Sequence, residues 1–283
     1  MAVSAARVAA RRLSNLAFVG FCWFVTAIAL AFLAAVLWTL VQKGAGGMSP
    51  TIFTLDTPAP GSPGGLRNAI LGSVMMCAFA MALAVIFGIL AGTWLAEYAG
   101  DSHYGSVVRF LNDVLLSAPS ILVGLFVWYL LVANVFHHFT GYAGGVALAL
   151  IAVPVIARTT EDVLRLQPTA LRESGVALGT PLWQVIRTIL WRAASAGILT
   201  GALLAFARIS GETAPLLFTA LNNQNLSGMG EAMANLPVVM FNDALSAYDD
   251  LRRLAWAAAL IVSAAVLGIT IIARFLTREQ KHG

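Results

Sequence analysis

Long runs of apolar residues, separated by short polar segments, set the pattern along this chain. An α-helix needs about 20 apolar residues to cross the hydrocarbon core of a bilayer, and six segments reach or approach that length. They are residues 16–41, 68–95, 114–135, 142–157, 193–221 and 254–276. The fourth is the shortest and needs its flanking residues to complete a crossing. The pattern therefore predicts an all-α polytopic membrane protein with six transmembrane helices.

The first apolar run follows three arginines, Arg7, Arg11 and Arg12, as the core of a secretory signal would. Its length of about 25 residues exceeds the 7–15 residues typical of a signal core. We expect an uncleaved anchor helix.

Composition supports the membrane assignment and excludes several other classes. Apolar residues make up 59% of the chain, charged residues only 11%, and the mean hydropathy is +0.84. A soluble domain would carry roughly a quarter charged residues. Cys22 and Cys77 both lie in apolar runs, so we interpret them as small buried hydrophobes rather than a disulfide or a metal pair. No metal site is predicted.

The basic residues predict the orientation, because cytoplasmic loops of membrane proteins carry an excess of Lys and Arg. With six crossings and a cytoplasmic N-terminus, the outer side holds four bases, namely Lys43, Arg67, Arg252 and Arg253. The inner side holds twelve, namely Arg7, Arg11, Arg12, Arg109, Arg158, Arg165, Arg172, Arg187, Arg192, Arg274, Arg278 and Lys281. This asymmetry predicts that both termini are cytoplasmic.

The chain divides into four parts on this prediction. Residues 1–15 form a cytoplasmic N-terminal segment, and 16–66 hold the first transmembrane helix with an external Gly/Pro-rich loop. Residues 67–276 form a core of five transmembrane helices, which includes a cytoplasmic coupling loop, 158–192. Residues 277–283 form a cytoplasmic tail. The external segment 222–253 mixes polar and apolar side chains, which suits a short helix at the outer interface, either touching a soluble partner or serving only as a connector.

The inner loop between the fourth and fifth spans has the features of a folded element. Pro168 can begin a helix, since a first-turn residue needs no intrahelical N–H bond, and Gly179 can end it in a left-handed conformation. Thr180 and Pro181 then begin the next helix. The loop suits docking of a soluble partner. For Glu173, the alternative to such a contact is a position on a helix face that only meets solvent.

Two charged residues, Arg208 and Glu212, lie inside the fifth apolar span. A charge at the bilayer centre costs about 2.5–3.5 kcal/mol, so both need a reason to be there. A spacing of four predicts that they share one face of a helix. They form either an internal salt bridge or a site for a passing ion. Gly211 and Pro215 flank Glu212 and can loosen the helix around it.

A similar proline lies in the third span, where Pro119 precedes Ser120. This pair can break the helix and direct backbone N–H groups toward an anion. A packing kink is the commoner explanation for such a proline.

These segments resemble permease subunits of ATP-binding-cassette importers. The inner loops of that family carry an E-A-A-x-x-x-G pattern, and residues 173–179 follow it, with Ser174 and Gly175 in place of the two alanines. Residues 201–220 closely resemble the fifth span of the PstA family of phosphate-importer permeases, and 119–126 and 234–237 are also similar to it.

The resemblance implies a type I importer permease fold in the bacterial inner membrane and a role in phosphate import. It further implies a PstC-like second permease, a PstB-like ATPase dimer that binds ATP and magnesium, and a PstS-like periplasmic phosphate-binding protein. Arg208, Glu212 and Ser120 would line the substrate pathway. Arg172, Glu173 and Gly179 would couple the chain to the ATPase.

The chain itself has no recognisable nucleotide site. Its only lysines, Lys43 and Lys281, do not follow a Gly-rich phosphate loop. We therefore expect a transport subunit rather than an enzyme, with no cofactor of its own. A permease for sulfate or molybdate is an alternative. A self-sufficient secondary transporter with Glu212 as its proton site is a further one, although no internal inverted repeat supports it.

Overall fold

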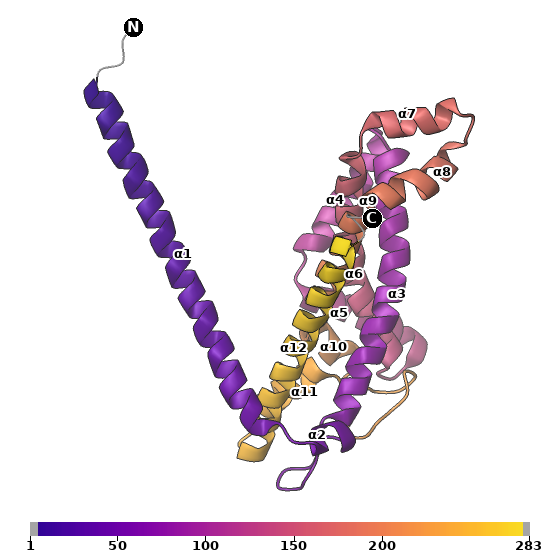
Figure 1. Cartoon of the computed structure of the whole chain (residues 1–283). Helices are drawn as coiled ribbons and strands as arrows, with labels where there is room; N and C mark the ends of the chain where they lie inside the picture. The colour runs from indigo at the N-terminus through magenta and orange to yellow at the C-terminus, as the bar shows by residue number, and fades with distance from the viewer. Residues whose placement is uncertain (1–4, 280–283) are drawn as a thin grey trace.

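The computed structural model describes the backbone of residues 5–279 and the side chains of residues 11–273 and 275. All regular secondary structure in this part of the chain is helical (Figure 1). Residues 1–4 of the predicted N-terminal segment and 280–283 of the predicted tail lie outside the described residues. The predicted all-α architecture is confirmed.

Five described helices are long and apolar enough to cross a membrane. They are α1 (Ala5–Gly47), α3 (Arg67–Glu97), α6 (Gly141–Arg165), the continuous series α8 (Leu182–Val185), η2 (Ile186–Leu190) and α9 (Trp191–Ile209), and α12 (Asp249–Glu279). A sixth crossing is present if one bent pair counts as a single span. That pair is α4 (His103–Ser117) followed by α5 (Ser120–Val127) with η1 (Trp128–Phe136).

The predicted third span, 114–135, is therefore wrong as a single helix. The chain turns by 104° between α4 and α5, and Ala118 and Pro119 between them have extended backbone. The cause lies in Pro119, because a residue that precedes proline is disfavoured in the α conformation. The predicted fifth span, 193–221, is also divided, since α9 ends at Ile209 and a separate short helix, α10 (Ala214–Thr219), follows.

Three further short helices lie in the loops: α2 (Thr51–Thr54), α7 (Thr169–Ala177) and α11 (Leu236–Ala244). The last confirms the short helix predicted within 222–253. The side chain of Asn235 caps α11 by accepting a hydrogen bond from the Val238 amide at 2.9 Å. Leu236, Val238 and Val239 are buried, so α11 packs into the bundle against α3 and α12 rather than lying free at a surface.

The centre of the molecule is the contact between α3 and α6. Ala80 and Ala84 of α3 meet Ala152 and Ile156 of α6, and Ala205 of α9 completes the cluster. Small side chains let helix backbones approach closely, which is the usual way that membrane helices pack. This core holds α9, and with it the break before α10.

Helix α1 stands apart from this core and meets the bundle only toward its C-terminal end, where it contacts α12 (Figure 1). Its apolar stretch has no buried residue. In the picture, α1 begins and α12 ends toward the end of the molecule that carries α7 and α8. This agrees with the predicted placement of both termini on the side of the inner loop; which face is cytoplasmic stays a prediction.

Candidate functional site

The two charged residues of the fifth span flank the end of α9. Arg208 lies in the last turn of the helix and is exposed, whereas Glu212 follows the helix end and is half-buried. The Glu212 amide still donates to the Ile209 carbonyl at 3.2 Å, which closes a turn. Within the described residues, neither side chain has an ion-pair partner. The expectation that Arg208 and Glu212 share one helix face is therefore wrong.

The local sequence explains why the helix ends here. Pro215 lies in the first turn of α10, where its missing N–H costs nothing. If α9 continued through this position, the proline ring would clash with the carbonyl of Gly211, four residues earlier. Both sides of the break remain hydrogen-bonded. On the α9 side the Ser210 hydroxyl donates to the Phe206 carbonyl at 2.7 Å, and on the α10 side the Leu216 amide donates to the Thr213 carbonyl at 3.1 Å.

The second proline-containing break, at Pro119, lies beside the first. Helix α5 packs along α10, and a Cβ atom at Gly124 would come within 2.5 Å of the Pro215 Cα. Only glycine permits this approach. Ser120, half-buried, is the first residue of α5. The structure thus brings the two interrupted segments together, but it shows no contact of Ser120 with Arg208 or Glu212 among the described side chains.

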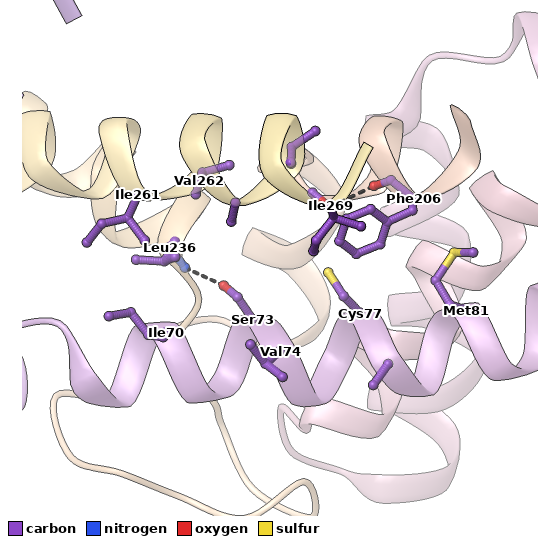
Figure 2. Close-up of a pocket in the computed structure, with 14 residues that line it drawn as sticks. Ile70, Ser73, Val74, Cys77, Met81, Phe206, Leu236, Ile261, Val262 and Ile269 are labelled. Carbon is purple, nitrogen blue, oxygen red and sulfur yellow. Dashed lines mark hydrogen bonds between the residues drawn. The ribbon is translucent and has the colours of Figure 1, made fainter. Parts of the chain in front are cut away.

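Two cavities lie near the break. The first, of ≈ 330 Å³, is enclosed by α3, α9, α11 and α12, and Cys77, Phe206 and Ile269 line it (Figure 2). Its main polar feature, the Ser73 hydroxyl, accepts a hydrogen bond from the Leu236 amide at 2.8 Å. No charged side chain lines this cavity. The second, of ≈ 420 Å³, has Thr213 of the break and Arg252 of α12 in its wall.

The inner loop is a compact helical hairpin. Helix α7 ends before Gly179, which has the left-handed conformation that was predicted (φ 78°), and α8 follows. Glu173 is exposed on α7, and apolar side chains are exposed beside it, with Leu178 at 86% and Trp183 at 59%. An exposed apolar surface on a structured loop is typical of a protein contact.

Arg172 has a different position from Glu173. Its guanidinium binds both carboxylate oxygens of Glu97, at 2.8 and 2.6 Å, and donates to the carbonyls of Leu164 and Gln167. The hydrogen bond with Glu97 raises the pKa of Arg172. In this structure Arg172 fixes α7 to the end of α3, and its expected part in coupling to the ATPase stays a prediction.

A second group of charges near this end was not singled out from the sequence as a site. Glu161, almost fully buried, accepts a hydrogen bond from Arg109 at 2.7 Å and forms an ion pair with Arg165 at 2.9 Å. Arg109 also donates to the carbonyls of Leu95 and Gly100 at 3.0 Å. The spacing of Glu161 and Arg165 by four residues was visible in the sequence. The pairing with Arg109, 52 residues away, was not.

Comparison with known proteins places these features in a family. Residues 84–282 match the family model described as the binding-protein-dependent transport system inner membrane component. The phosphate transport system permease protein PstA of Haemophilus influenzae is 48% identical over 272 residues, which cover 96% of each chain. The PstA of Yersinia pestis is 49% identical over 255 residues, 89% of this chain and 86% of the relative.

A more distant relative and a solved structure agree. The PstA of Mycobacterium leprae is 35% identical over 226 residues, 78% of this chain and 74% of the relative. A chain of the inward-facing MetNI methionine ABC transporter has the same fold, with a TM-score of 0.67 and 18% identity, over 82% of this chain and 99% of its own. The predicted fold, that of a type I ABC importer permease, is confirmed. This chain belongs to the PstA family of permeases, among the inner membrane components of binding-protein-dependent transport systems.

Proposed function

We propose that this chain is the membrane-spanning permease subunit of an ATP-driven importer that carries inorganic phosphate across the inner membrane of a bacterium. The observation that carries the proposal is the similarity to phosphate transport system permeases at 48% identity along 96% of the chain. The coupling hairpin supports the same conclusion, because it offers a separate ATPase a structured surface. A secondary transporter needs no such element.

Arg208 is the residue to which we assign contact with the anion. A guanidinium offers two parallel hydrogen bonds to oxyanion oxygens. Arg208 is exposed and has no ion-pair partner among the described residues, so its donors are free for a ligand. Glu212 lies just beyond the helix end, where its carboxylate can accept the O–H of hydrogen phosphate. Ser120 stays a candidate third contact.

This arrangement favours phosphate over sulfate or molybdate, which remain the alternative cargo. Sulfate carries no proton at neutral pH and would face Glu212 without a hydrogen to donate. A carboxylate beside the site also weakens anion binding, and transport requires binding that is weak enough for release.

The partners are assigned by family and by the shape of the loop. We propose a PstC-like second permease, a PstS-like binding protein on the outer side and a PstB-like ATPase dimer that holds ATP and magnesium. Glu173, with the exposed apolar side chains of Leu178 and Trp183, would enter a groove on the ATPase. Gly179 would set the turn of the hairpin, and Arg172 would keep the hairpin attached to α3.

The proposal is tested by phosphate uptake into proteoliposomes. They contain this chain, the second permease and the ATPase dimer, and they are supplied with the binding protein and ATP. The variant Arg208→Gln removes the positive charge and one of the two parallel hydrogen-bond donors of the guanidinium. Since hydrogen bonds to charged groups contribute about 1.5–3 kcal/mol, we expect uptake at limiting phosphate to fall at least about tenfold, with assembly unchanged.

Arg192→Gln is the matched control, because Arg192 is also exposed on α9 and has no ion pair among the described side chains. Normal uptake by the Arg208→Gln variant would remove Arg208 from the pathway. ATP-dependent uptake of sulfate or molybdate, with none of phosphate, would overturn the cargo assignment.

A further inference from the structure

A basic cleft lies at the end of the molecule opposite the α7–α8 hairpin, between the last turns of α1 and the first turns of α12. Its volume is ≈ 790 Å³. The charged side chains in its wall are Lys43 from α1 and Asp249, Arg252 and Arg253 from α12. Trp256 forms part of the same wall. The cleft shares Arg252 and Trp256 with the ≈ 420 Å³ cavity that reaches Thr213, but Arg208 and Glu212 do not line it.

Close contact between the two helices builds this cleft. A Cβ atom at Gly47 would come within 2.5 Å of the Arg253 carbonyl, and one at Gly44 within 2.7 Å of the Leu260 Cβ. The absence of side chains on this face of α1 lets it lie directly on α12. As a result, the ammonium group of Lys43 lies 5.0 Å from the centre of the Trp256 ring, a distance at which a cation and an aromatic face attract.

The charges of the cleft do not cancel. Asp249 pairs with Arg252, which leaves the exposed Lys43 and Arg253 without a carboxylate partner among the described residues. Arg253 follows the first turn of α12, where Asp249 and Asp250 already complement the helix dipole. The sequence assigns only four bases to this side of the membrane, and three of them gather here. The cleft is thus complementary to a negatively charged group.

The surroundings indicate that this group belongs to an amphiphile. On α1, directly before the cleft, Trp38 and Val41 are 65% and 51% exposed, and both belong to the apolar stretch of that helix. Trp256 lines the cleft, and tryptophan is enriched where membrane proteins meet the headgroup region. A ligand here would meet bases at one end and a lipid-facing apolar helix at the other.

We propose that this cleft binds the headgroup of an anionic phospholipid, with its phosphate between Lys43 and Arg253 and its acyl chains along α1. A lipid bound there would reinforce the direct contact between α1 and α12. It does not depend on which anion the permease carries.

The experiment uses the full chain, purified in its transporter complex and placed in nanodiscs of phosphatidylcholine, either alone or mixed with phosphatidylglycerol. Native mass spectrometry measures the lipid retained on this chain. The variant Lys43→Gln/Arg253→Gln should bind phosphatidylglycerol roughly 25-fold more weakly, because each base near an anionic surface contributes a factor of about five. Arg67→Gln is the control, since Arg67 lies toward the same end but pairs with Asp56 at 2.9 Å.

A second variant covers the case in which the double variant does not fold. Gly46 lines the cleft, and a Cβ atom there meets nothing within 4 Å, so Gly46→Asp adds a repelling carboxylate without a clash. Loss of phosphatidylglycerol retention in either variant, with the control unchanged, supports the site. Equal retention by the wild type and both variants would overturn it. Displacement of the lipid by inorganic phosphate at the concentrations used for transport would assign the cleft to the free ion instead.

Discussion

Removal of the Arg172 guanidinium should loosen the coupling hairpin from the transmembrane bundle. The guanidinium makes four hydrogen bonds of 2.6–2.8 Å, two to Glu97 and two to backbone carbonyls at the end of α6. The Glu97 side chain is 3% exposed and that of Arg172 is 21% exposed. In Arg172→Ala, a nearly buried carboxylate would lose the one ion-pair partner it has among the described residues.

The magnitude follows from this burial. Breaking a fully buried ion pair by removing one partner costs about 3–5 kcal/mol. Because Arg172 keeps partial contact with solvent, we expect about 3 kcal/mol for the local opening of α7. Since 1.36 kcal/mol corresponds to a factor of ten, the amides of Thr169–Ala177 should exchange with deuterium roughly a hundredfold faster. Arg172→Lys, which keeps the charge but loses the fork, should give an intermediate rate.

Hydrogen-exchange mass spectrometry of α7 peptides measures this change in the assembled transporter. Arg187→Ala is the control, because Arg187 is exposed in the same loop and has no ion pair among the described residues. In the combined variant Glu97→Ala/Arg172→Ala, the free energy of α7 opening should fall by clearly less than the sum of the two single-variant losses, because the effects of contacting residues are not additive. Additive losses, within about 0.5 kcal/mol, would refute the pairing as the tether.

Three further outcomes are expected. Glu173→Lys should weaken retention of the ATPase during purification, since it reverses a charge on the exposed face of α7; unchanged co-purification would count against docking there. Gly47→Ala should lower the melting temperature of the α1–α12 contact, because its Cβ meets the Arg253 carbonyl at 2.5 Å, whereas Gly46→Ala should not; calorimetry compares the two, and equal values would contradict the packing argument. Burial raises the pKa of Asp243 from 3.8 to about 6, so the native state binds more protons than the unfolded state, and stability should fall as pH rises from about 4 to about 6. In Asp243→Asn this fall should be absent from thermal unfolding scans, and a fall of the same size would exclude Asp243 as its source.

The fold was largely predictable because membrane insertion leaves a strong signal in the sequence. A helix that crosses a bilayer must be long and apolar, and the pattern located all six apolar regions. Hydropathy alone did not locate the breaks at Pro119 and before Ala214, since both lie inside continuous apolar runs. The residues Pro119, Gly211 and Pro215 did indicate where these helices could be interrupted. Hydropathy reports the solvent around a segment, whereas a break depends on the backbone preferences of two or three residues.

The site was predictable only in part for a related reason. Arg208 and Glu212 were conspicuous because charges are rare in a lipid environment. The prediction that they share a helix face assumed a continuous helix, which Pro215 prevents. Gly179 was predicted correctly, since its requirement is local. The pairings of Glu97 with Arg172 and of Glu161 with Arg109 join residues 75 and 52 positions apart. No local pattern carries such information.

The tether at Arg172 also determines how a mechanical load would enter the membrane. Along the covalent chain, α7 is followed by α8, η2 and α9, and therefore by the break at Glu212. Through space, α7 is already bound to the end of α3, and α3 forms the main contact of the bundle with α6. If the ATPase displaced the hairpin, the force would act on α3 and α6 at the centre of the subunit and also on α9, which ends beside the proposed anion site. The subunit would then rotate about its α3–α6 core, and α9 would move with it.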